Sequence, residues 1–379
     1  IIPRHNGRLW GIVLVFFLAL MASQAQAIDL KRFKNKDGGK FNVVDTIATL
    51  GKFPRFCVNT YKWFNRTFNS YDSLYVVGHG RDFTIRPALH IWWDDHLFLV
   101  PGEYPFQMTL ATDPFMQVGI KGSFKFLNYT YQFRPTSRDK KGLSKYFGVG
   151  ITLNMLDIQY HHHKNEVGTT LSSLKYKDNI LLSNIPYDGF TSSVHTLDIH
   201  YFFNHHKYSR SAAFQMGRIQ KKSSGSFFLG TKIESHKLAF DMAIVCKKLE
   251  EKYGPFDDGE TVPDTAVVNF DYMNYHITGG YGHNFVLGKG WIIGLCDAVS
   301  LGLTRGIADG DNVKRSQLGF ANKASLAIGW NNPRLFVNLT ADFMFCSYKH
   351  TNYYMFEGYG TAQLAVGYRF SLWGKNKGW

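Results

Sequence analysis

The chain has 379 residues, of which 16% are aromatic and 36 are glycine, and its formal net charge is +14 at pH 7. Its four cysteines are far apart and form no C-x-x-C pair, which excludes a zinc site of that type and a dense disulfide framework. We therefore expect free thiols. The mean hydropathy of −0.20 is typical of a barrel, because lipid-facing and lumen-facing residues cancel in the average.

Residues 1–27 have the three parts of an export signal. Arg4 and Arg8 give a positive start, the stretch LWGIVLVFFLALM is apolar, and Ala25-Gln26-Ala27 is a small-residue cleavage site. An apolar stretch of about 13 residues is too short to span a bilayer as a helix. We expect cleavage after Ala27. An exported chain with no further long apolar run is either soluble or a transmembrane barrel.

The segment 28–81 is predicted to be basic and helical. It begins with DLKRFKNKDGGK, and apolar residues then recur at spacings of three, as at Val44, Ile47 and Leu50. Such helices either lie on the surface of the inner leaflet or cap the mouth of a barrel.

Between residues 82 and 372 the period changes to two, which predicts β-strands. About twelve runs of residues show the alternation of side chains that is expected of barrel strands. They include FTIRPALHI at the start, SAAFQMGRIQ, SFFLGTKI and KLAFDMAIV in the middle, and TAQLAVGYRFSL at the end. In the last run Leu364, Val366 and Tyr368 share the face expected to meet lipid, and Arg369 lies on the opposite face.

The connections favour a fixed orientation. The expected periplasmic turns NHHKYS, ESHK, NFVLGK and NNPR are short, and most outer loops, such as 93–115 and 162–190, are long. The connections 134–144 and KKSSG do not fit this alternation. We predict an all-β fold, a transmembrane antiparallel up-and-down β-barrel of about 12 strands with a short N-terminal helical segment. Ten or fourteen strands also fit, and a short periplasmic tail follows at 373–379.

Three stretches resemble a known family. DSLYVVGHGRDFTIRPAL, YSRSAAFQMGRIQKKSSGSFFLGTKI and LAVGYRF are similar to an uncharacterised outer-membrane family of Bacteroides-type bacteria, a domain of unknown function. The resemblance covers residues 70–372. It implies an outer-membrane barrel without a known activity, so no functional residue follows from it.

Two histidine-rich runs, YHHHK at 160–164 and NHHKY at 204–208, are candidate metal ligands. Neighbouring residues of a strand point to opposite faces, so only alternate histidines share a face. Both runs lie beside expected loops, and we favour solvated turns. We expect no metal and no cofactor.

Polar residues on the face opposite lipid predict a charge network inside the barrel, because an unpaired buried charge is costly. Its expected members are Asp157, Asp198, Arg218, Asp241, Asn338, Asp342 and Arg369. Asp297 is different. It shares parity with Trp291 and Leu295, which would place a carboxylate toward lipid, and we interpret it as a candidate partner contact.

The role of the barrel stays open at this point. It is either a small pore or passive conduit, or an accessory subunit of a larger outer-membrane complex. The alternative is an outer-leaflet enzyme acting on lipid or peptide, with His276 and Ser300 as candidates by parity. The basic charge favours outer-membrane lipids, including anionic lipopolysaccharide, as partners and not nucleic acid.

Overall fold

The computed structural model divides into two compact units, residues 1–70 and 71–379, and each is described by itself. The described residues are 55–56, 59–60, 63, 66–103, 105–135, 143–255, 264–306, 316–349 and 353–371. The first unit is helical at its described positions up to residue 68. The predictions for 1–27, 28–54 and 373–379 lie outside the described residues. No described helix is long and apolar enough to cross a membrane.

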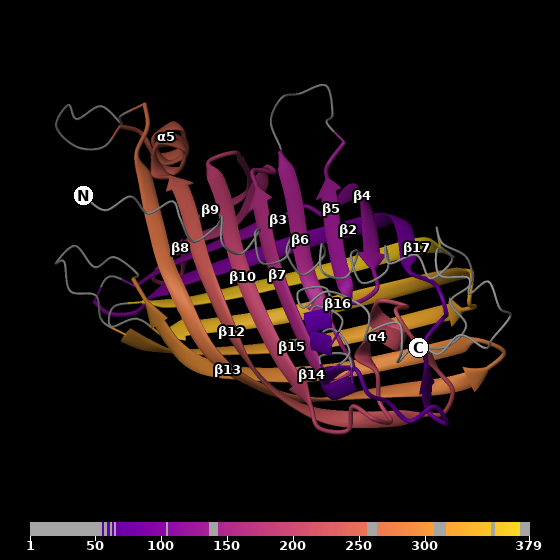
Figure 1. The fold of residues 1–379 in the computed structure, drawn as a ribbon. Coiled ribbons are helices and arrows are strands. Elements are labelled where there is room, and N and C mark those ends of the chain that lie inside the picture. The colour runs from indigo at the N-terminus through magenta and orange to yellow at the C-terminus, as the bar shows by residue number, and fades with distance from the viewer. Residues whose placement is uncertain are drawn as a thin grey trace, which may run out of the picture. The chain divides into compact units, whose positions relative to one another are not determined.

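Twelve strands of the second unit close into an antiparallel barrel (Figure 1), as predicted. Each strand pairs with the next one round the wall, and the last, β17, pairs back onto β2. The twelve are β2 (Phe83–Val100), β4 (Phe115–Phe124), β5 (Leu127–Phe133), β6 (Ser144–Thr152), β7 (Leu156–Asn165), β10 (Phe190–Phe202), β12 (Ser224–Asp241), β13 (Val267–Gly288), β14 (Trp291–Arg305), β15 (Ser316–Asn331), β16 (Leu335–Lys349) and β17 (Tyr354–Phe370). We call the end where β2 begins and β17 ends the inner end, and the opposite end the outer end.

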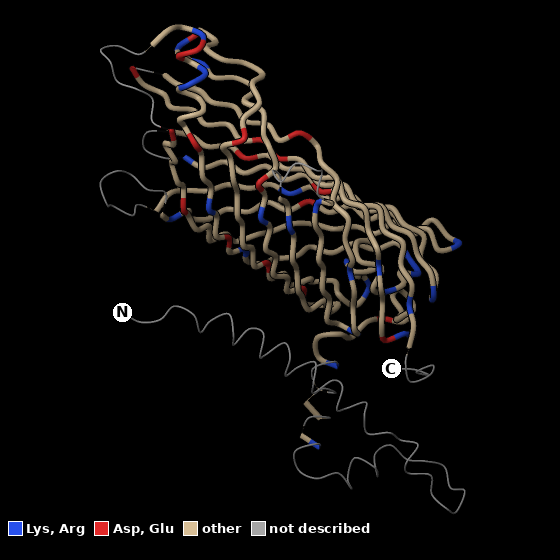
Figure 2. The backbone as a smooth tube through the Cα atoms, turned by 90° about the horizontal axis from the view of Figure 1, so that it is seen from above, with Lys and Arg blue, Asp and Glu red and all other residues tan. Residues whose placement is uncertain are grey.

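The wall has an apolar outer face. On β17 the side chains of Leu364, Val366 and Tyr368 are 47%, 51% and 52% exposed, whereas Arg369 is 1% exposed and points inward. Exposed leucine, isoleucine and aromatic side chains continue around the other strands, and lysines, arginines and carboxylates also lie along the strands (Figure 2). An apolar exterior around a polar interior is the pattern of a barrel that crosses a membrane.

At the outer end of the barrel the pairing partner of β2 changes. β2 pairs with β4 as far as Trp92, and with β3 (Phe106–Thr112) from Asp95 onward. Strands β8 (Thr169–Tyr176) and β9 (Asn179–Tyr187) continue from β3. Residues 93–115 and 162–190 were expected to be loops, and that expectation is wrong because they form this outer section of sheet.

Helix α5 (Met242–Tyr253) covers the edge of β9, where the Lys252 Nζ and Tyr253 hydroxyl both donate to the Leu181 carbonyl. The sequence prediction divided this region incorrectly. SFFLGTKI and the first part of KLAFDMAIV form one continuous strand, β12, and the helix begins where the Asp241 carboxylate accepts from the Ala243 amide.

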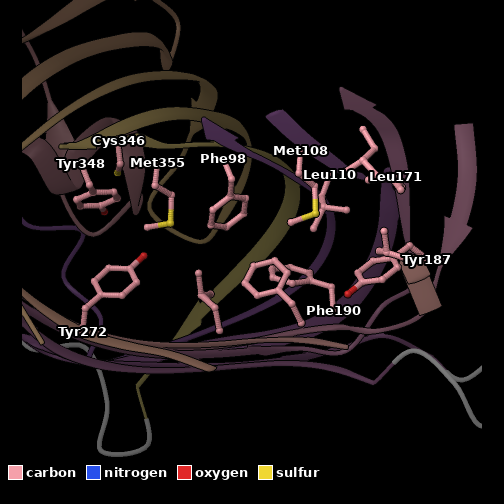
Figure 3. Packing of buried hydrophobic residues seen from close by; sticks show 14 of the residues in the cluster. Phe98, Met108, Leu110, Leu171, Tyr187, Phe190, Tyr272, Cys346, Tyr348 and Met355 are labelled. Carbon is pink, nitrogen blue, oxygen red and sulfur yellow. The ribbon is translucent and has the colours of Figure 1, made fainter. Parts of the chain in front are cut away.

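Apolar side chains fill the inside of the outer section (Figure 3). Leu110, Leu171, Phe240 and Met355 are at most 1% exposed. They come from β3, β8, β12 and β17, so the cluster joins the two parts of the wall across the barrel axis. We call this cluster the outer core. It packs like the interior of a soluble domain and occupies the lumen at the outer end.

Candidate functional site

A segment between β10 and β12, residues 203–223, fills the inner end of the barrel and is called the plug here. It contains the short helix α4 (Arg210–Phe214) and strand β11 (Ile219–Gln220), which pairs with β1 (Val76–Val77). The sequence prediction of a strand at SAAFQMGRIQ is therefore wrong. The segment alternates like a strand, but its apolar residues are buried inside the lumen.

Hydrogen bonds hold the plug from opposite sides of the wall. Arg86 on β2 donates to the Gln215 carbonyl at 2.6 Å, and Arg369 on β17 donates to the Met216 carbonyl. Asn338 on β16 donates to the Phe214 carbonyl at 3.4 Å, and Asn284 on β13 donates to the Ser209 carbonyl at 2.8 Å. The carbonyls at the end of a short helix thus find partners on the wall, as buried carbonyls require.

Packing adds to these hydrogen bonds. Ala212, Ala213 and Met216 of the plug are 0% exposed and contact Ile292, Ala327 and Phe336 of the wall. Two wall glycines make room for them: a Cβ at Gly294 would lie 2.6 Å from the Ala213 Cβ, and one at Gly329 would overlap the Met216 methyl. The plug therefore fits a recess shaped for it.

His79, in the loop before β2, lies against this inner end. Burial, aided by the charges of Arg369, Arg218 and Arg81, lowers the pKa of His79 to about 3. Its uncharged Nδ1 accepts from the Arg81 amide at 3.2 Å. The ring is therefore neutral at physiological pH.

A polar chamber of about 310 Å³ lies between the plug and the outer core. It is lined by Arg210 and Gln215 of the plug and by Leu238 and Cys346 of the outer core, and strand side chains form the rest. This volume corresponds to roughly ten water molecules. The plug therefore borders the chamber toward the inner end, and the outer core borders it toward the outer end.

Ion pairs line the chamber. Arg210 lies 3.2 Å from Asp157, Lys232 lies 2.8 Å from Glu234, and Lys323 lies 3.7 Å from Asp342. Asp342 also accepts from Ser325 at 2.5 Å. A chamber with several buried charges is stable when those charges are paired in this way.

A second group of charges lies directly beneath the outer core. His96 lies 3.7 Å from both Asp94 and Glu357, and His236 lies 3.8 Å from Glu234 and 4.0 Å from Glu357. Tyr272 donates to Glu357 at 2.6 Å. This group was not predicted from the sequence, although the alternation D-x-H on β2 and E-x-H on β12 places both members of each pair on the luminal face.

The predicted interior residues have different positions. Asp157, Asp198 and Asp342 line the chamber. Asn338 and Arg369 hold the plug. Arg218 belongs to the plug segment, with its guanidinium 5.2 Å from the Tyr71 ring, and Asp241 caps α5 outside the chamber.

The histidines of the run at 160–164 lie on different faces of the wall. His161 and His163 line the chamber, while His162 stacks on His195 of β10 at 4.0 Å. No group of three or more His, Cys, Asp or Glu suited to a metal ion occurs in the described part of the chain. His276 and Ser300 are both buried, and Ser300 shares a hydrogen bond with Thr278 at 2.8 Å, so they form no pair at the rim.

Asp297 lies on the outer face of β14, where it is exposed. It accepts from the Asn322 amide on β15 at 3.1 Å. Ala324 and Ala341 are small residues beside it, and Phe285, Leu326 and Phe343 are larger residues around them. Together they line an apolar groove of about 540 Å³ across β13–β16. A carboxylate at this depth of an apolar wall is unfavourable unless something covers it.

The chain matches one family model over residues 70–370. It belongs to the family described as domain of unknown function DUF4421. No curated protein matches it. The Bacteroides-type origin is not established by this match, and membership assigns no activity.

Solved structures similar to this chain include three outer-membrane barrels or transporters. The outer membrane protease OmpT from Escherichia coli is 6% identical, with 77% of this chain and 97% of that chain covered and a TM-score of 0.35. The translocator domain of the autotransporter NalP from Neisseria meningitidis is 11% identical, with 76% and 88% covered and a TM-score of 0.33. The P. putida toluene transporter TodX is 8% identical, with 76% and 90% covered and a TM-score of 0.26. None of these activities is transferred to the DUF4421 chain.

Proposed function

We propose that this DUF4421 protein is an outer-membrane barrel with a closed lumen that serves as an accessory subunit, bound through its outer wall to another outer-membrane barrel. Its leader is removed after Ala27, and its inner end faces the periplasm. Apart from the plug, the connections at the inner end are short and most of those at the outer end are long, which supports this orientation.

The closed lumen carries the proposal. A passive conduit needs a continuous aqueous path, and here the plug occupies one end and the outer core the other. Arg86 and Arg369 fix the plug from neighbouring strands, and Leu110 and Met355 are fully buried in the outer core. Of the conduit and the accessory subunit, only the accessory subunit does not need an open lumen. The enzyme alternative has no support at the rim, because its candidates His276 and Ser300 are buried.

The groove around Asp297 supports a partner in the plane of the membrane. No ion pair joins Asp297 to a cation among the described residues, and only the Asn322 amide is bonded to its carboxylate. The proposed occupant is the wall of a second, larger barrel that presents a lysine, arginine or other hydrogen-bond donor. Aromatic walls around small residues give such a partner an apolar recess with one charged point.

Two measurements test the proposal. The first is the native mass of the tagged protein, purified in mild detergent, for the wild type, Asp297→Leu and a control. The control, Asp271→Leu, removes another exposed aspartate of the wall, which precedes the buried Tyr272 on β13. We expect a stoichiometric large complex in the wild type and the control, and a lone folded barrel in Asp297→Leu.

The second measurement is conductance in a planar bilayer. We expect no stepwise current from the wild-type barrel. A steady open channel, or a wild-type protein that purifies alone under all mild conditions, contradicts the proposal.

A further inference from the structure

A different part of the outer face carries a row of basic side chains near the outer end. The strand register aligns Lys145 of β6 with Lys164 of β7, Lys164 with Ser193 of β10, and Ser193 with Lys237 of β12. All four residues point away from the lumen. Lys145 and Lys237 are exposed, and the Lys164 side chain is 45% exposed. We call these four residues the basic row.

A polar aromatic row lies one step toward the membrane. The same register aligns Phe147, His162, His195 and Ser235. The rings of His162 and His195 are stacked at 4.0 Å and 3°. The His162 Nε2 lies 3.2 Å from the Ser193 hydroxyl, and the His195 Nδ1 lies 2.8 Å from the Tyr160 hydroxyl. These contacts fix the positions of both rings on the wall.

One more step inward the wall becomes apolar. The aligned residues there are Val149, Tyr160, Leu197, Ile233 and Tyr275. The basic row also lies at the edge of the wall, because β6 begins one residue before Lys145 and β7 ends one residue after Lys164. The order along the barrel axis is therefore cationic, then aromatic with hydrogen-bonding groups, then apolar.

We propose that this surface binds a phosphorylated, acylated glycolipid of the outer leaflet, of the lipopolysaccharide class. Its phosphates lie on the basic row and its acyl chains on the apolar wall below. Lys145 and Lys237 are three strands apart, about 14 Å at the usual strand spacing, so the row spans a head group with more than one phosphate. Among the described residues only Lys164 of the three lysines has an ion-pair partner, Glu166. Asp271 of β13 lies opposite Lys237 in the strand register but forms no ion pair with it, so Lys145 and Lys237 can both contact the lipid.

The apolar wall decides between a lipid and a free anion. A site for phosphate alone has no use for the apolar residues beneath the histidines, whereas acyl chains cover them. This inference uses the outer-membrane placement given above, but neither the closed lumen nor the groove at Asp297. Loss of the complex in Asp297→Leu and loss of lipid binding are therefore separate results.

The test is lipid binding by native mass spectrometry of the full barrel in detergent. The probes are lipid A with its phosphates, the same lipid A after phosphatase treatment, and inorganic phosphate. The test variant is Lys145→Gln/Lys164→Gln/Lys237→Gln. The control, Lys175→Gln/Lys248→Gln/Lys349→Gln, removes three lysines of β8, α5 and β16 that lie outside the basic row. Retention of the heat-modifiable folded band shows that each variant forms a barrel.

We expect the wild type and the control to bind phosphorylated lipid A equally. The affinity of the test variant is expected to fall about 100-fold, since each lysine near a membrane surface contributes roughly fivefold. Dephosphorylated lipid A should bind the wild type as weakly as phosphorylated lipid A binds the variant. Equal loss in the control, equal binding of dephosphorylated lipid, or displacement by inorganic phosphate at matched phosphate concentration overturns the proposal.

Discussion

The plug gives the sharpest prediction, because a native cysteine lies directly above it. Cys296 is 8% exposed, lines the chamber and packs with Tyr208 of the plug. The double variant Arg86→Leu/Arg369→Leu removes the two guanidinium hydrogen bonds to the plug carbonyls of Gln215 and Met216. Each hydrogen bond to a charged group contributes about 1.5–3 kcal/mol. Their loss should therefore favour the open plug by about 3–6 kcal/mol.

Each 1.4 kcal/mol is tenfold in an equilibrium constant, so plug opening should become at least about 100-fold more frequent. The assay is the rate at which a water-soluble maleimide modifies Cys296 in the detergent-solubilised barrel, located by peptide mass mapping. The modification rate should rise with plug opening, while that of Cys346, 1% exposed in the outer core, should stay low.

The bilayer current is the matched readout. It should remain absent in this double variant, because the outer core still closes the other end of the lumen. Unchanged labelling of Cys296 would refute the role given to the two arginines. A current in the double variant would refute the seal assigned to the outer core.

Three further predictions concern the two seals. Gly294→Val should displace α4 and raise Cys296 labelling, since its Cβ would lie 2.6 Å from Ala213; an unaltered labelling rate would contradict the close fit. Leu110→Ala should lower the free energy of unfolding in urea by about 2–5 kcal/mol without exposing Cys296. His79 binds fewer protons folded than unfolded between its folded pKa of about 3 and 6.5, so its contribution is complete above pH 6.5 and is lost as the pH falls toward 3. The urea midpoint of His79→Gln should therefore fall less than that of the wild type over this range, and equal falls would contradict the assignment.

The alternation of side chains was sufficient to predict the barrel wall. In β17 the even positions face outward and the odd positions inward over the whole strand, as the sequence indicates. The count of about twelve strands also holds, because each long strand keeps one apolar face. The same parity correctly predicted that Asp297 lies on the outer face. The partner contact at Asp297 stays a prediction.

The plug was not predictable from the same pattern. Ala212, Ala213 and Met216 are apolar because they contact the inside of the barrel, and alternation does not distinguish that environment from lipid. The helix α5 left a signal that was missed: Asp241 precedes Met242, Val245 and Leu249 at helical spacing, and Gly254 follows the last turn. Because it is short and directly follows a strand, its sequence was interpreted as a continuation of that strand.

The residues on the luminal face of a single strand follow the same order as the three regions of the interior, which are the plug, the chamber and the outer core. On β12, Phe228 packs with the plug side of the lumen, Lys232, Glu234 and His236 line the chamber, and Leu238 and Phe240 enter the outer core. β2 repeats this order, with Arg86 at the plug, His90 and Asp94 at the chamber, and Phe98 in the outer core. A lumen-facing row that changes from apolar or plug-binding to charged and back to apolar indicates a barrel closed at both ends. An open pore needs no apolar residues at its outer mouth, so this order along a single strand is the feature that separates a closed barrel from a conduit.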